Sequence, residues 1–128
     1  MIKDITVNSE KMLQDIFDKA HYEAAKAMDY ALHKWRESNP DQDLYGGYHE
    51  PPYCGFAWVN IAPGTSKFAR ELKKAGVVRG RSYYGGVDVW NPGGIPTQSM
   101  DVKEIAADAY VKVLGNYGIR ATMMSRAD

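Results

Sequence analysis

The sequence predicts an α+β fold, in which a long N-terminal helix precedes a ferredoxin-like antiparallel sheet with two further helices. An apolar stripe at helical spacing runs from Leu13 to Trp35, and a strand-forming run covers Cys54 to Ile61. After Cys54 the expected order is strand, helix, strand, strand, helix, strand, which is the split βαβ arrangement. A chain of 128 residues is long enough to bury one core. We therefore expect a single domain over residues 1–128.

The first part of this domain, residues 1–39, is predicted to be an extended arm and one amphipathic helix. Asn8 or Ser9 can cap the helix with a short polar side chain. The helix spans about 27 residues, or about 40 Å, and ends before Pro40, because proline disfavours helical geometry in the preceding residue. Its apolar stripe needs a partner, either the sheet or a second copy. The stripe contains Leu13, Ile16, Phe17, Ala20, Ala24, Ala27, Met28, Ala31 and Trp35.

Residues 40–53 are predicted to form a loop, because Gly46-Gly47 and Pro51-Pro52 oppose a regular element. The βαββαβ core then occupies residues 54–128. Its first strand, from Cys54 to Ile61, is apolar on both faces and is expected to be central in the sheet. Alternation places Ala57, Val59 and Ile61 on one face and Phe56, Trp58 and Asn60 on the other.

The other elements of the core follow from caps, turns and periodicity. Pro63-Gly64-Thr65-Ser66 opens a short helix that ends at Gly76, with Phe68, Leu72 and Ala75 facing inward. Val77–Tyr84 and Val87–Trp90 form two strands about Gly85-Gly86. After the loop Asn91–Ser99, a helix begins at Asp101 and ends near Gly115–Gly118, and Ile119–Ser125 is the last strand. The inward residues of that helix are Val102, Ile105, Ala106, Ala109, Val113 and Leu114. An alternative fuses the two middle strands and gives a three-stranded α/β sheet.

Two loops are candidates for a shared ligand site. If the first strand and Val87–Trp90 run parallel, Ala62–Ser66 and Asn91–Ser99 lie at the same edge of the sheet. Free amides at a helix start favour an anion there, although the spacing of a nucleotide-hydrolysing loop is absent. A helix cap without ligand is the alternative. The candidate residues are Asn60, Gly64, Thr65, Ser66, Lys67, Asn91, Gln98 and Ser99.

The second face of the central strand is a candidate interaction surface. Phe56, Trp58 and Trp90 are expected on adjacent strands, with Arg79, Arg81 and Arg120 beside them. RNA-recognition domains stack bases on aromatic side chains at this place, but their signature string is absent here. The alternative is that the long helix covers these aromatic residues, because its apolar stripe needs a partner of similar area.

Catalysis and metal binding have weak support in the sequence. Cys54 and the nearby His49 could act as a nucleophile and its base. Because no local feature lowers the thiol pKa, we expect instead a buried, structural cysteine that reacts slowly with thiol reagents. The three histidines and Cys54 show no short ligand spacing. The protein is therefore expected to bind rather than to catalyse, without cofactor or metal. Acids exceed bases in residues 1–53, and bases exceed acids in residues 54–90, so the charge distribution is predicted to be two-ended.

The amino-acid sequence of residues 54–128 resembles that of small proteins of unassigned function from tailed bacteriophages. The resemblance is carried by Cys54–Ile61, Pro63-Gly64, Phe68-Ala69, Tyr83–Val87 and Ser125–Asp128. It implies a viral origin and supplies no activity. With no apolar leader and no membrane-length segment, we expect a protein of the host cytoplasm, with incorporation in a virion as one destination.

Three function classes remain from the sequence. The first is a phage accessory or virion protein that acts through protein contacts, as a homo-oligomer or with a host protein. The second is a binder of small anions or nucleotides, and the third is a binder of single-stranded nucleic acid on the aromatic face.

Overall fold

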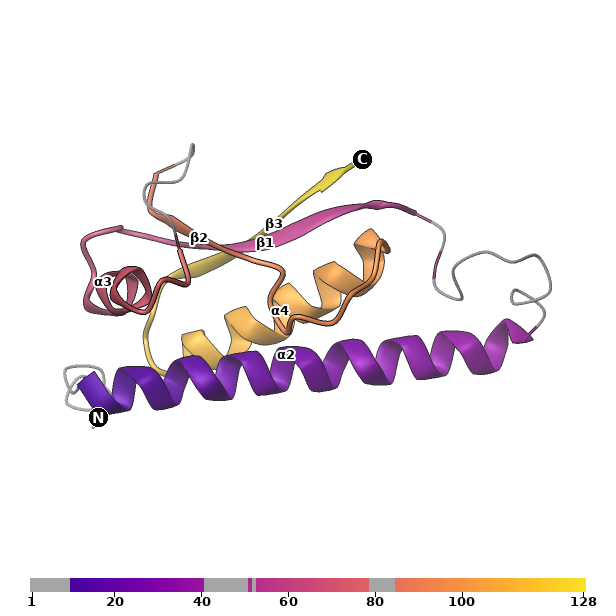
Figure 1. Cartoon of the computed structure of the whole chain (residues 1–128), viewed down its shortest axis with the longest axis horizontal. Helices are drawn as coiled ribbons and strands as arrows, with labels where there is room; N and C mark the ends of the chain where they lie inside the picture. Colours follow the sequence, from indigo (N-terminus) through magenta and orange to yellow (C-terminus); the bar gives the residue numbers. More distant parts are fainter. Residues whose placement is uncertain (1–9, 41–50, 52, 79–84) are drawn as a thin grey trace.

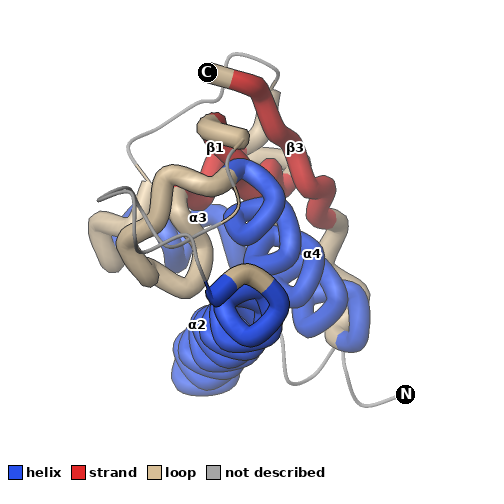
Figure 2. The backbone as a smooth tube through the Cα atoms, turned by 90° about the vertical axis from the view of Figure 1, so that its right-hand side faces the viewer, coloured by secondary structure: helices blue, strands red, loops and turns tan. Residues whose placement is uncertain are grey.

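A computed structural model of the chain describes residues 10–40, 51, 53–78 and 85–128. These residues form three helices and a three-stranded antiparallel sheet, which confirms the predicted α+β class. The sheet, helix α4 (Met100–Asn116) and helix α2 (Glu10–Ser38) lie in successive layers (Figures 1 and 2). Helix α3 (Lys67–Lys74) lies at one end of the sheet (Figure 1).

The predicted long helix is confirmed as α2, with 29 residues, and it ends at Ser38 as expected. The side-chain amide of Asn39 donates to the carbonyl oxygen of Trp35 at 2.8 Å, so it satisfies one of the free acceptors of the last turn. The two candidate N-terminal caps, Asn8 and Ser9, lie outside the described residues. The buried stripe of α2 consists of Leu13, Ile16, Ala20, Ala24, Met28 and Leu32.

The partner of this stripe is α4, whereas the sequence predicted the sheet or a second copy. α4 runs antiparallel to α2 and lies between it and the strands (Figures 1 and 2). Trp35, which was expected to be buried, is only half buried. The reason is length: α2 spans about 43 Å and α4 about 25 Å, so the C-terminal end of α2 extends beyond its partner (Figure 1).

The central strand and its alternation are confirmed in β1 (Gly55–Ile61), which lies between β2 (Val87–Trp90) and β3 (Ala121–Ala127). Its inner face presents Ala57, Val59 and Ile61 to the core, where they join Val87 and Val89 of β2. Because α4 covers this inner face, the other face of each strand points away from both α4 and α2 (Figures 1 and 2).

The parallel direction of the first strand and Val87–Trp90, on which the shared loop edge depends, is wrong, because β1 and β2 are antiparallel. Ile61, the last residue of β1, pairs with Val87, the first residue of β2. Helix α3 does not cross the sheet but lies beside this end of β1 (Figure 1), so the chain re-enters the sheet where it left. The strand order β2-β1-β3 and the antiparallel strand directions agree with three neighbouring strands of a ferredoxin-like sheet, whereas the place of α3 at the end of the sheet does not.

The other element boundaries agree in part with the prediction. Val77 and Val78 are not in a strand, and residues 79–84 of that predicted strand lie outside the described part. The last strand begins and ends two residues later than predicted, at Ala121 and Ala127. Two residues expected to face inward are exposed, because they lie off the buried stripes of their helices: Ala75 after α3 and Ile105, 41% exposed, on α4.

Candidate functional site

The shared loop edge predicted for the anion site does not form in this fold. Thr65, Ser66 and Lys67 follow the Ile61 end of β1, whereas Gln98 and Ser99 lie at its other end, where the amide of Gly55 donates to the carbonyl oxygen of Gln98 at 3.2 Å. Seven strand residues, about 20 Å, separate the two loops. The antiparallel direction of β2 is the cause, because it reverses the end at which Asn91–Ser99 leaves the sheet.

The polar groups of the two loops have structural partners instead. The Ser66 hydroxyl accepts from the amide of Ala69 at 3.2 Å, and the Ser99 hydroxyl accepts from the amide of Val102 at 3.3 Å. Both serines are therefore helix caps, which was the alternative interpretation. Asn60 donates to the Gly85 carbonyl and to Asp88, Gly64 accepts from Lys73, and Asn91 is exposed with a positive φ of 49°.

The outer face of the sheet brings together aromatic residues from two strands. Trp58 of β1 pairs in register with Trp90 of β2, and their rings stack with centroids 4.6 Å apart. Trp90 is 54% exposed and Phe56 is 37% exposed, whereas Trp58 beneath is only 7% exposed. We call this surface the outer face; besides these three aromatic residues it carries Asn60, Asp88, Thr122, Met124 and Arg126.

The alternative that the long helix covers these aromatic residues is wrong. α2 packs on α4, and both helices lie on the opposite side of the sheet (Figures 1 and 2). Trp58 is covered instead by the stacked ring of Trp90. The indole N–H of Trp58 is buried without a hydrogen-bond partner, which costs free energy in the isolated chain.

Two cations that the sequence did not identify flank Phe56. The Lys103 amine lies 5.0 Å from the ring centroid and donates to the Gly55 carbonyl at 2.8 Å, and the Arg126 guanidinium lies 5.6 Å from the ring. Lys103 comes from α4, and Arg126 falls beyond the predicted end of the last strand, so neither was expected here. Of the predicted arginines, Arg120 lies at the other end of the sheet, where its carbonyl accepts from Ala62, and Arg79 and Arg81 lie outside the described residues.

A small notch adjoins the exposed aromatic residues. It has a volume of about 140 Å³. An apolar cavity of about 150 Å³ holds a benzene-sized group, so the notch is large enough for one ring or one branched side chain. Its walls combine two aromatic rings, a proline and one cation: Phe56, Ala57, Trp90, Asn91, Pro96, Thr97 and Lys103.

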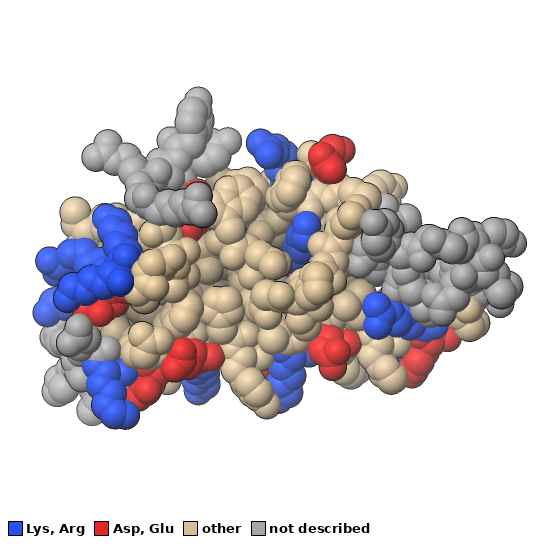
Figure 3. All heavy atoms as spheres, in the orientation of Figure 1, with Lys and Arg blue, Asp and Glu red and all other residues tan. Residues whose placement is uncertain are grey.

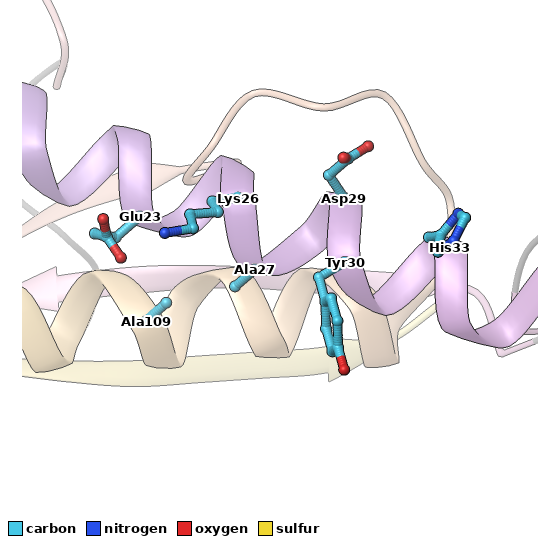
Figure 4. A pocket seen from close by; sticks show the side chains of 7 residues that line it. All are labelled: Glu23, Lys26, Ala27, Asp29, Tyr30, His33 and Ala109. Carbon is cyan, nitrogen blue, oxygen red and sulfur yellow. The ribbon is translucent and has the colours of Figure 1, made fainter.

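A larger, more open groove of about 520 Å³ lies between α2 and α4. Figure 4 shows Ala27 and Ala109 facing each other between the two helices, with Tyr30 reaching across α4. Its rim carries charges of both signs, from Glu23, Lys26 and Asp29, beside His33. This mixture selects no single ligand charge, so the groove is a weaker candidate than the outer face.

The basic end of the molecule is separate from the aromatic residues. Helix α3 carries four cations and one acid, and Figure 3 shows Lys and Arg gathered at the end of the molecule where α3 lies. That end adjoins Ile61, whereas Phe56 and the notch lie toward the start of β1. In the part of the chain that the structure describes, the cations that nucleic acid would need are therefore concentrated away from the rings that would stack its bases.

The expectation of a buried cysteine is wrong, because Cys54 is exposed at the edge of β1. Its thiol contacts the Gln98 side-chain oxygen at 3.9 Å, and its proposed base, His49, lies outside the described residues. The slow reaction with thiol reagents that burial would cause is no longer expected. Among the described residues, no three His, Cys, Asp or Glu side chains are grouped to hold a metal ion, and no helix is long and apolar enough to span a membrane.

His21 is the described histidine with an altered pKa. Its ring packs edge-on against Phe17 and Tyr110, and its Nδ1 accepts from the amide of Gly93 at 3.3 Å. Burial lowers the pKa of His21 below its ordinary 6.5, and the carboxylate of Asp18 offsets part of this shift. The neutral ring is therefore the form that the fold selects, because a protonated Nδ1 cannot accept from Gly93.

We expect His21 to make stability depend on pH. The unfolded chain takes up a proton near pH 6.5 and the folded chain only at a lower pH, so stability is full above 6.5 and falls as pH drops through the folded pKa. His21→Phe keeps an aromatic ring but cannot titrate, and should flatten this dependence. Urea unfolding at about pH 7.5 and about pH 5 measures the difference. An equal pH dependence in the two proteins would contradict the assignment.

Comparisons with protein-family models, with curated proteins and with solved structures give no match. The function of this chain is therefore argued from the arrangement of its own residues, above all from the outer face.

Proposed function

We propose that this chain is a non-catalytic binding protein that holds a protein partner on the outer face of its sheet. The observation that carries the proposal is the exposed pair of rings: Trp90 is 54% exposed over the buried Trp58, and Phe56 is 37% exposed beside the notch. Soluble monomers seldom expose large aromatic side chains side by side without a partner. Tryptophan and arginine are also enriched among the residues that dominate protein interfaces.

A protein fits this surface better than a nucleic acid. Both nearby cations, Lys103 and Arg126, already lie over the ring of Phe56, and Lys103 also donates to the Gly55 carbonyl. Among the described residues, the main concentration of positive charge is on α3, at the other end of the sheet. The notch suits a single apolar side chain, which would act as an anchor between Phe56 and Trp90.

The resemblance to tailed-bacteriophage proteins supports a more specific proposal, that the chain is an accessory or virion component made in the host cytoplasm. The residues that carry the resemblance include all of β1, together with Phe68 and Ala69 of α3 and the end of β3. The region therefore contains the surface to which we assign the binding function.

Trp90→Ala should weaken partner binding about 30-fold, as removal of a dominant interface residue costs about 2 kcal/mol. Tyr22→Ala is the matched control, because Tyr22 is 64% exposed on α2, which lies on the other side of the sheet. Immobilised wild-type protein, Trp90→Ala and Tyr22→Ala are compared for quantitative capture from an extract of phage-infected bacteria, and captured proteins are titrated back individually.

Equal capture by all three proteins would contradict the assignment of the outer face. Quenching of tryptophan fluorescence by a thymidine oligomer, saturable in the wild type and lost in Trp90→Ala, would instead favour the nucleic-acid alternative.

A further inference from the structure

A second candidate interaction surface, separate from the outer face, is the edge strand β3. β3 is an edge strand, because the order of the sheet is β2-β1-β3 and no described residue pairs with its second side. It has seven residues, without proline or glycine, and its one charge, Arg126, lies on the outer face. Natural edge strands are usually short or protected by proline, inward charges or a bulge. The opposite edge, β2, has four residues and is followed by Pro92.

The hydrogen bonds at the two ends of β3 identify which main-chain groups are free. The Ala62 amide donates to the Arg120 carbonyl at 3.3 Å, and the Asp128 amide donates to the Cys54 carbonyl at 3.1 Å. Both pairs continue the β1–β3 register, so the even-numbered residues of β3 face β1. The N–H and C=O groups of the odd-numbered residues point away from the sheet. These residues are Ala121, Met123, Ser125 and Ala127.

We propose that this edge pairs with the same edge of a second copy, which forms a symmetric dimer with one continuous six-stranded sheet. In an antiparallel β3–β3 pair centred on Met124, Ala121 faces Ala127 of the second copy and Met123 faces its Ser125. All four outward residues of each chain then exchange main-chain hydrogen bonds. The arrangement repeats itself under two-fold rotation, as a closed dimer requires.

The charges at this edge favour the same register. It places Arg120 opposite Asp128 of the second copy, twice by symmetry, and both residues are exposed and extend the register of β3. Arg126 faces the uncharged Thr122. A shift of two residues would align Met123 with Met123 of the second copy and would put Arg126 opposite Arg120. It would also leave one outward residue per chain unpaired. Opposite charges stabilise cross-strand pairs and like charges destabilise them. The edge is therefore complementary to itself in one register.

The dimer places two outer faces next to each other, with Met124 of each chain at the two-fold axis. This inference does not depend on the proposed binding function, because it uses main-chain groups at the edge and not the aromatic rings. Trp90→Ala should leave the dimer intact, so failure of one proposal can be distinguished from failure of the other.

Native mass spectrometry and sedimentation of the full chain test the proposal. The wild type is expected to be a dimer at micromolar concentrations. Met123→Pro removes an outward N–H that makes no bond to β1, so it should give a folded monomer, and Met123→Ala is the matched control that keeps this N–H and the dimer. Circular dichroism establishes that both variants are folded.

A charge exchange tests the register without a change in the main chain. Arg120→Glu and Asp128→Arg should each weaken the dimer about tenfold, because each creates two like-charge pairs, and the double variant should restore it. A monomeric wild type overturns the proposal. If Met123→Pro is still a dimer, or if the charge exchange leaves dimer affinity unchanged, the contact lies on another surface. Either result also overturns the proposal.

Discussion

Truncation of Ile16 to alanine is expected to lower the free energy of unfolding by about 2–5 kcal/mol. Ile16 is 1% exposed and belongs to the stripe by which α2 packs on α4. The loss combines the transfer free energy of the removed methyl groups with a cavity between two helices, which cannot close without moving both. Urea unfolding monitored by circular dichroism measures this loss, with an unchanged m-value as evidence that only stability has changed.

Trp35→Ala is the informative comparison for Ile16→Ala. Tryptophan is the larger side chain, but Trp35 is only half buried at the end of α2 that extends beyond α4. We therefore expect Trp35→Ala to cost less than Ile16→Ala. A larger loss from Trp35→Ala would contradict this ranking and would mean that the C-terminal end of α2 has a partner outside the described contacts.

Replacement of Gly55 by alanine is expected to destabilise the protein by about 1–3 kcal/mol, the usual cost of overpacking. A methyl group at Gly55 would lie 2.8 Å from the Arg126 carbonyl oxygen and 2.8 Å from the Met100 sulfur. The methionine side chain can move, but the carbonyl belongs to the paired strand β3. We expect the substitution to loosen the β1–β3 pair near Phe56, and a thermal melt should show a fall of a few degrees per kcal/mol.

Gly115→Ala provides the matched control for Gly55→Ala. Gly115 lies in α4, and a methyl group there meets no atom within 4 Å. Alanine lowers the entropy of the unfolded chain and is the better helix former, so this variant should gain about 0.5–1 kcal/mol. A stable Gly55→Ala protein would show that β3 can move away from β1 at little cost.

Much of the candidate site was predictable from short stretches of chain. Alternation in Cys54–Ile61 placed Phe56 and Trp58 on one face, and the β1–β2 register brings Trp90 to the same face. The predicted site was incomplete because its cations come from other elements: Lys103 reaches Phe56 from α4, and Arg126 reaches it from the last strand. No periodicity within one segment reports which side chains of distant elements meet.

By itself, the sequence determined the long helix, the central strand, and the caps Ser66 and Ser99, because these features depend on interactions within a few residues. The tertiary structure alone decided that β2 runs antiparallel to β1, that α4 is the partner of α2, and that the aromatic face is open among the described residues. The direction of a strand depends on the end of the sheet at which the connection before it re-enters. Here α3 lies at the end of the sheet and not across it, a choice made by long-range packing of Phe68 and Leu72.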